Sequence, residues 1–183
     1  ISVVMSTYNN EASIEKAILS IVNQSFSEWE LLIVDDASKD NTNKILKKLV
    51  DKYNRIQYFT NPSNKGLAYN LNKLIKISKG KYIARMDADD ISMHNRLAKQ
   101  YKFLENNSKI SVLGTGAKVI YNNKSKNVFP PRFHEDIIKN IILKTPFIHP
   151  TVIMRKSFLI NNNFYRTNIG EVEDLDLWLR TCN

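Results

Sequence analysis

The first ninety residues alternate between short apolar runs and longer segments with helical spacing. Four runs are continuously apolar or rich in β-branched residues, as expected for strands covered on both faces. They are Ser2–Ser6, Leu31–Val34, Ile56–Phe59 and Tyr82–Met86. Three longer segments place apolar residues at i, i+3, i+4 and i+7, which predicts helices with one buried stripe. They are Glu11–Gln24, Asn41–Tyr53 and Gly66–Ser78.

This order of elements predicts an α/β fold of Rossmann type, with a mostly parallel sheet and flanking helices. Strands that alternate with helices join through right-handed crossovers and place helices on both faces of the sheet. In such open sheets, ligands bind outside the carboxyl ends of the strands. Three polar clusters follow the predicted strands, so we expect them at one edge of the sheet. They are Ser6–Asn9, Asp35–Ser38 and Asp87–Asp90.

The second half of the chain has a weaker pattern. Ile110–Tyr121 alternates enough to predict a strand. Asn122–Ser125 is typical of a hairpin turn that leads back into Asn127–Phe129. Two proline-containing stretches indicate irregular structure that could shape a cleft: Pro130–Pro131 and Pro146–Pro150.

The composition is typical of one globular domain. The 183 residues are 43% apolar and 25% charged. No apolar run approaches the roughly 20 residues that cross a bilayer, and no signal peptide precedes the first strand. Cys182 is the only cysteine, which excludes an intrachain disulfide and a cysteine-based zinc site and fits a reducing compartment. Because the chain starts without Met and stops within a helical pattern, we expect a fragment whose C-terminal part is missing.

The net charge of +9 comes largely from lysines spread along the predicted helices. Lysines at this spacing usually form a solvated face. The alternative is attraction toward an anionic membrane surface or another polyanion. We expect no nucleic-acid binding, because no aromatic-interleaved basic stripe, zinc finger or RNP-like motif is present.

Three carboxylates follow the fourth apolar run directly: Asp87, Asp89 and Asp90. On a strand, residues i and i+2 point the same way, so Asp87 and Asp89 would face one site. Two like charges this close repel each other unless a cation lies between them. Hard oxygen ligands suit Mg²⁺ or Mn²⁺, and these ions suit phosphate. An isolated D-x-D is as compatible with a solvated acidic turn, but the second acidic strand end at Asp35 and Asp36 favours a site.

The other two clusters offer groups for a nucleotide. Tyr8 could stack on a flat base, and Asp36 could accept a hydrogen bond from a base or ribose donor. Alternatively, Tyr8 packs at a strand end, and the Asp35–Asp40 segment caps the following helix through Ser38 or Asp40. One of the two aspartates could be structural while the other binds.

Taken together, these residues resemble the inverting family 2 glycosyltransferases, which have the GT-A fold. The matching blocks are in family order and span nearly the whole chain. They are Val3–Asn9, Ser20–Phe26, Trp29–Asp40, Asn64–Gly66, Gly80–Asp90, Asn95–Leu97 and Glu173–Arg180. The resemblance divides the single domain into a nucleotide-binding half, residues 1–90, and an acceptor half, residues 91–183.

The resemblance implies a role for residues at the matching positions. Tyr8 would lie beside the base of a sugar nucleotide, and Asp36 would read a base ring nitrogen. Asp87 would lie by the ribose and the metal, and Asp89 would be the direct ligand of Mn²⁺ or Mg²⁺. Ser6 and Asn64 are the further substrate-binding candidates. The chain departs from the family at Leu71, where members often carry an arginine before Asn72, so a phosphate contact from that turn is not expected.

Asp174 resembles the family's general base, which deprotonates the acceptor hydroxyl. Inversion by single displacement needs one base within hydrogen-bond reach of the acceptor oxygen. The predicted helix Glu173–Arg180 starts at this position, and its dipole favours the ionised form of a carboxylate. The alternative is that Glu173 and Asp174 only cap the helix. His149 could face the acceptor cleft or the metal, although a histidine packed at a strand end is commoner, and His94 and His134 are expected on the surface.

The expected function is transfer of a sugar from a nucleotide-diphosphate sugar, with a UDP-sugar favoured, to a hydroxyl of a glycan or lipid-linked acceptor. We expect a cytoplasmic enzyme of bacterial surface polysaccharide biosynthesis, with contact to the inner face of the membrane as a further expectation. The alternatives are a nucleotidyltransferase of related fold and a non-catalytic basic module that binds glycans or lipids. The nucleotidyltransferase is disfavoured because Thr7–Asn10 lacks the glycine-rich phosphate loop of such enzymes.

Overall fold

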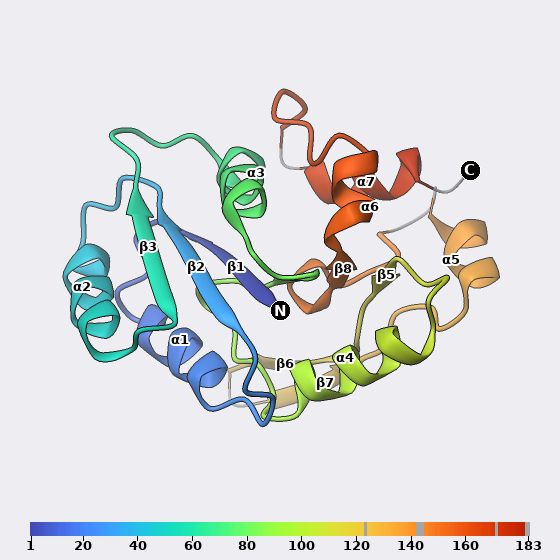
Figure 1. Ribbon diagram of the computed structural model, residues 1–183, viewed down its shortest axis with the longest axis horizontal. Coiled ribbons are helices and arrows are strands. Elements are labelled where there is room, and N and C mark those ends of the chain that lie inside the picture. The colour runs from blue at the N-terminus through green and yellow to red at the C-terminus, as the bar shows by residue number, and fades with distance from the viewer. Residues whose placement is uncertain (123, 142–144, 171, 182–183) are drawn as a thin grey trace.

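The computed structural model describes residues 1–122, 124–141, 145–170 and 172–181, and it contains a six-stranded sheet in the order β3-β2-β1-β4-β8-β5. The first four strands are parallel: β1 (Ser2–Thr7), β2 (Glu30–Asp35), β3 (Ile56–Thr60) and β4 (Tyr82–Arg85). Two short strands complete the sheet: β8 (Ile153–Arg155), antiparallel to β4, and β5 (Val112–Leu113), antiparallel to β8. The predicted mostly parallel α/β sheet is therefore confirmed (Figure 1).

Helices cover both faces of the sheet because successive strand residues alternate between two apolar cores. Val3 and Met5 point into one core, where α1 (Ile14–Val22), α2 (Thr42–Lys52) and α4 (Arg96–Asn106) pack. Val4 points into the other core. There, α3 (Leu67–Ile77), α6 (Lys156–Asn161) and α7 (Glu173–Arg180) pack. Figure 1 shows these two layers, with α3, α6 and α7 on the side of the sheet opposite α1 and α2.

The predicted strand Ile110–Tyr121 is wrong as a single element. The structure divides it into β5, which joins the main sheet, and β6 (Ala117–Tyr121), which pairs with β7 (Lys124–Val128) in a separate two-stranded sheet. The break falls between Gly114 and Gly116, where other groups approach the backbone. A Cβ on Gly114 would lie 2.9 Å from the Phe147 ring, and one on Gly116 would lie 2.9 Å from a backbone oxygen.

The predicted hairpin is confirmed, with a shorter turn than expected. Tyr121 pairs with Lys124, so Lys124 and Ser125 belong to β7 rather than to the turn. Asn122 has a φ of 46°, which Asn tolerates better than most residues. Asn123, the other turn residue, lies outside the described residues, as does Cys182.

The remaining elements are short. The helix α5 (His134–Asn140) has no buried residue, and the proline-containing stretch 146–150 leads into one turn of 3₁₀ helix, η1 (His149–Thr151). Among the described helices, none has the length and apolar character to span a bilayer.

Candidate active site

The strand order has a switch point between β1 and β4. The crossovers from β1 to β3 run outward in one direction, and the next crossover returns to place β4 on the other side of β1. The crevice for a ligand in such a sheet lies at the carboxyl ends of these strands. Backbone hydrogen bonds fix this edge: Asp36 N donates to Thr7 O at 2.8 Å, and Met86 N donates to Val4 O at 3.2 Å. The three predicted polar clusters therefore come together at one edge.

Asp36 is buried, with 3% of its surface exposed, and its carboxylate organises the next loop. Its Oδ1 accepts hydrogen bonds from Lys65 N at 2.9 Å and from Asn61 Nδ2 at 2.8 Å. Its Oδ2 accepts from Gly66 N at 2.9 Å. A carboxylate has about four acceptor positions, so a base donor would share Asp36 with this loop. That Asp36 contacts the base of a nucleotide stays a prediction.

A row of amide side chains extends from Asp36 to Ser6. Asn61 Nδ2 also donates to Asn70 Oδ1 at 2.7 Å, and Asn70 Nδ2 donates to Ser6 Oγ at 3.0 Å. Asn70 is fully buried, and this network fixes the Ser6 hydroxyl at the end of β1. Asn64, the other substrate-binding candidate, is exposed, and its Oδ1 accepts from Gly66 N at 3.1 Å in the loop that Asp36 holds.

Asp35 is structural, as predicted for one of the two aspartates, but the predicted side-chain cap is absent at the N-cap position of α2, where Asn41 forms no capping hydrogen bond. Its Oδ1 accepts from Ser38 N at 3.1 Å, and its Oδ2 accepts from Asn43 Nδ2 at 3.2 Å. Ser38 Oγ in turn accepts from Asn9 N at 2.9 Å, which ties the loop after β1 to the loop after β2. Tyr8 lies in this ordered loop with 43% of its surface exposed, so its ring is available for stacking.

The cluster after β4 contains one paired carboxylate and two exposed ones. Asp87 forms an ion pair with Arg85, whereas Asp89 and Asp90 lie at the surface. Although Asp90 is exposed, partial burial of its carboxyl group, followed by the negative charges of Asp87 and Asp89, raises its pKa. Within the described residues, no group of three or more His, Cys, Asp or Glu side chains is arranged to hold a metal by itself. One or two carboxylates with substrate phosphates are a usual Mg²⁺ environment, so these residues fit an ion that binds together with a nucleotide.

Arg85 is a site residue that the prediction missed. Its side chain is buried, and among the described residues its Nε has no hydrogen-bond partner. Its charge acts on the neighbouring pair His149 and Tyr165: it helps to lower the pKa of His149 and offsets part of the rise in the pKa of Tyr165. The signal was available in the sequence, since a charged residue inside the apolar run Tyr82–Met86 requires a buried partner.

A second arginine fixes the end of β4. Arg96, the first residue of α4, donates from Nη2 to Arg85 O at 2.8 Å and to Val152 O at 3.3 Å. Burial and the neighbouring Arg85 lower the pKa of Arg96 to about 10. The side chain therefore joins α4 to the strand that carries the acidic cluster.

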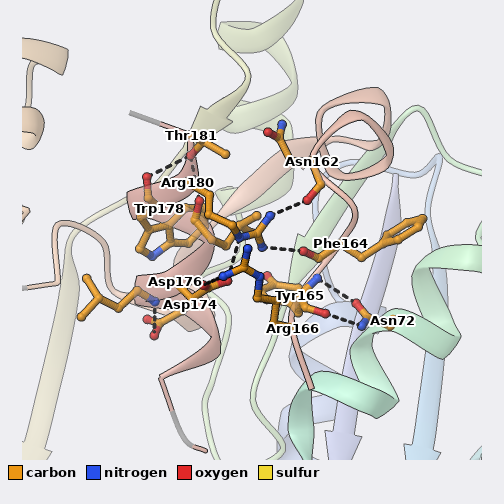
Figure 2. A network of polar contacts seen from close by, with 12 residues as sticks. Asn72, Asn162, Phe164, Tyr165, Arg166, Asp174, Asp176, Trp178, Arg180 and Thr181 are labelled. Carbon is orange, nitrogen blue, oxygen red and sulfur yellow. Dashed lines mark hydrogen bonds and ion pairs between the residues drawn. The ribbon is translucent and has the colours of Figure 1, made fainter. Parts of the chain in front are cut away.

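Asp174 lies in the first turn of α7, and this helix is anchored by side chains rather than by a sheet (Figure 2). Arg180 donates from Nε to Asp176 Oδ2 at 2.8 Å within the helix, and its Nη2 donates to Phe164 O at 2.8 Å, which ties α7 to the preceding segment. Asp174 itself is half-buried, and its Oδ1 accepts from Leu175 N at 2.7 Å. The predicted helix Glu173–Arg180 is confirmed, whereas the role of Asp174 as a base stays a prediction.

The segment before α7 is clasped by α3. Asn72 Nδ2 donates to Tyr165 O at 2.7 Å, and Tyr165 N donates to Asn72 Oδ1 at 3.1 Å (Figure 2). Asn72 lies within residues 1–90, so a side chain of the first half of the chain holds the backbone that leads toward α7.

His149 is packed, as the commoner alternative predicted. Its Nε2 lies 3.0 Å from Tyr165 Oη, and its Nδ1 lies 4.0 Å from Glu173 Oε1. Burial, and then the charge of Arg85, lowers the pKa of His149 well below its usual range. Burial also raises the pKa of Tyr165, with smaller contributions from Asp174 and Glu173. The histidine is therefore neutral and lies between Arg85 and the start of α7. His94 and His134 are exposed, as predicted.

Comparisons with known proteins find related sequences and folds. The model of Glycosyl transferase family 2 matches residues 2–164. The putative glycosyltransferase EpsE of Bacillus subtilis is 39% identical over 98% of this chain, which spans 66% of that protein. The Escherichia coli protein WfgD, named as a UDP-Glc:alpha-D-GlcNAc-diphosphoundecaprenol beta-1,3-glucosyltransferase, is 32% identical over 93% of this chain and 74% of its own length.

Two solved structures share the fold. Staphylococcus aureus TarS, residues 1–349 in complex with UDP-GlcNAc, superposes with a TM-score of 0.80 at 24% identity, covering 98% of this chain and 52% of that one. The mannosyltransferase PcManGT of Pyrobaculum calidifontis, in complex with GDP-Man and Mn²⁺, superposes with a TM-score of 0.73 at 18% identity, covering 96% and 50%.

Proposed function

Because the chain belongs to glycosyl transferase family 2, we propose that it transfers a sugar from a nucleoside-diphosphate sugar to an acceptor hydroxyl with inversion. The observation that carries the proposal is the position of Asp87 and Asp89 at the switch point between β1 and β4. Ligands of open α/β sheets bind at this point. A UDP-sugar is the favoured donor, since WfgD is named for one and TarS was solved with one.

The donor would lie across the carboxyl ends of β1, β2 and β4. Tyr8, with its exposed ring, would stack on the base. Asp36 and the 61–66 loop that it holds would contact the base edge, and the fixed Ser6 hydroxyl would lie beneath the nucleotide. The Asp36 carboxylate, the loop that it holds and the Ser6 hydroxyl are fixed by hydrogen bonds within the protein, so little ordering would be needed on binding.

We propose that Asp89 is the direct ligand of Mn²⁺ or Mg²⁺ and that Asp87, held by Arg85, lies beside the ion and the ribose. A bound divalent cation neutralises the charge that develops on the departing diphosphate. PcManGT, which has the same fold, was solved with Mn²⁺ and GDP-Man. Asp89 is exposed, so it is free to meet a metal–nucleotide complex.

Asp174 is the proposed general base. It is half-buried in the first turn of α7, where the helix dipole favours its ionised form. The anchors of α7 through Arg180 would hold this carboxylate at the acceptor hydroxyl. The proposed acceptor is a glycan or a lipid-linked sugar, as in the name of WfgD, and the proposed setting is bacterial surface polysaccharide synthesis in the cytoplasm. Contact with the membrane belongs to the same proposal.

The test measures UDP binding with and without Mn²⁺ by titration calorimetry and by the shift in thermal unfolding. Saturation at a hundredfold excess over Kd should stabilise the fold by about 2.7 kcal/mol. Asp89→Ala should abolish the Mn²⁺ dependence, while Asp51→Ala, which removes an exposed carboxylate from α2, should not. Equal UDP binding with and without Mn²⁺ in the unchanged protein would contradict the metal role. Absence of binding to any nucleoside diphosphate would contradict the proposed function.

A further inference from the structure

The β6–β7 hairpin, residues 117–128, exposes apolar side chains for which the fold offers no cover. Val119, Ile120 and Tyr121 are 52%, 71% and 75% exposed. The two strands form a sheet of their own beside the main sheet (Figure 1). A lone two-stranded hairpin is marginally stable in water. Three consecutive exposed apolar residues on such an element indicate that something covers them.

One face of the hairpin combines apolar and basic side chains in register. Val119 pairs with Lys126, and Tyr121 pairs with Lys124, and directly opposed residues point to the same face. These four residues also line a shallow hollow of about 310 Å³. The other face carries Ile120. Each apolar residue on the first face thus has a lysine directly beside it.

The charge around the hairpin has one sign. Residues 106–134 contain no aspartate or glutamate. The segment contains five cations: Lys109, Lys118, Lys124, Lys126 and Arg132. The lysines of α2 differ, because Asp51 lies among them on the same helix. The hairpin and its flanking segments therefore carry a net positive charge beside the exposed apolar side chains.

The size and charge of this face decide between possible occupants. Five paired residues on two strands give a face of roughly 170 Å², whereas a stable protein interface buries about 800 Å² on each partner. A second copy would bring the same positive charges against it in a symmetric contact. An anionic bilayer needs only a few apolar residues at its surface, with lysines reaching the lipid phosphates.

We propose that the β6–β7 hairpin docks on an anionic lipid surface, with Val119 and Tyr121 among the headgroups and Lys124 and Lys126 against lipid phosphates. The inference rests on the proposed function in one respect: a lipid-linked acceptor would be presented at that surface. The hairpin is joined to the acceptor side of the site, since Thr115 N donates to Thr151 Oγ1 at 3.1 Å and Thr151 belongs to the same short helix as His149.

The experiment is co-sedimentation with vesicles of phosphatidylcholine, with and without 30 mol % phosphatidylglycerol, at about 0.1 M salt. Each lysine at an anionic surface contributes roughly a fivefold gain in partitioning. Replacing Lys124 and Lys126 by serine should weaken binding about 25-fold. The matched control replaces Lys47 and Lys48, which are exposed on α2, by serine and should change binding less than fivefold. Both variants lose the same net charge.

Tyr121→Trp tests insertion directly. Its emission should shift to the blue on phosphatidylglycerol vesicles, whereas Trp29 and Trp178 are buried and should not respond. Equal losses in the two double variants would reduce the effect to net charge and overturn the proposal. Absence of vesicle binding, or self-association that Tyr121→Ser abolishes, would overturn it as well. UDP binding with Mn²⁺, measured on every variant, reports on the proposed function independently, because none of these residues belongs to the donor site.

Discussion

The two halves of the chain build their parts of the site by different means. In residues 1–90, strands of four to six residues lie in a parallel ladder, and their buried backbone holds the polar clusters. In residues 91–183, the main sheet gains only β5 and β8, of two and three residues. Side-chain hydrogen bonds to loop backbone replace the ladder there. The part of the site in residues 1–90 is therefore fixed by the sheet, and the part in residues 91–183 by a few side chains.

Asp36 and Asp174 illustrate the difference. Asp36 is buried and accepts hydrogen bonds from three residues of another loop. Asp174 is half-buried, and its carboxylate accepts a hydrogen bond from Leu175 N, the next residue of its own helix. A change at Asp36 should therefore alter structure and binding together, whereas a change at Asp174 should alter chemistry alone.

The largest expected effect is on catalysis. Asp174→Asn removes the proposed base and should lower kcat by about 10³-fold, within the range for a general base, with the UDP dissociation constant unchanged. Transfer is measured as UDP release from a UDP-sugar in the presence of acceptor. Asp136→Asn, an exposed change on α5, is the control. Unchanged transfer would show that Asp174 is not the general base.

Asp36→Asn should lower both the stability of the fold and the affinity for UDP. The amide replaces one acceptor oxygen with an N–H donor, which would face the donors of Asn61 and Lys65 or the donor of Gly66. The free energy of unfolding should fall by about 1 to 3 kcal/mol, with weaker UDP binding. Urea unfolding measures the first and calorimetry the second. A loss of UDP binding at constant stability would show that Asp36 serves the base alone.

Arg85→Met tests the connection between the halves. If Arg85 positions Asp87, its loss should weaken Mn²⁺ binding in the presence of UDP roughly tenfold, and Arg85→Lys should recover part of it. Titration of Mn²⁺ into the UDP complex measures this. Tighter Mn²⁺ binding in Arg85→Met would instead show that Arg85 acts by charge repulsion and does not position the carboxylate.

The smallest expected effect concerns pH. The folded pKa of His149 is depressed, so the unfolded chain binds the proton more readily. Stability should be constant above the unfolded pKa near 6.5 and fall as the pH drops below it, by about 1 kcal/mol per pH unit until the folded pKa is reached. Urea midpoints at pH 7.5, 6.5 and 5.5 measure the slope. His149→Gln should reduce the slope, and His94→Gln, at an exposed site, should not.

How much the sequence predicts follows the same division. The continuous apolar runs of the first half predict β1 to β4 within a residue or two, because strands buried on both faces admit few polar residues. The hairpin was predicted, but the break at Gly114–Gly116 was not, since it depends on Phe147 and Phe129 from later segments. Arg85 and Asn72 were missed as structural connections, because their partners are distant in sequence or belong to the backbone.

The clasp between Asn72 and Tyr165 has a consequence for recombination within the family. Consider a hybrid that joins the first ninety residues of one relative to the second half of another. In it, the side-chain amide of Asn72 must still reach the backbone N–H and C=O of position 165. A hybrid that altered the course of the backbone at position 165 would lose both hydrogen bonds of Asn72. Residues 1–90 and 91–183 are therefore expected to fold as one unit.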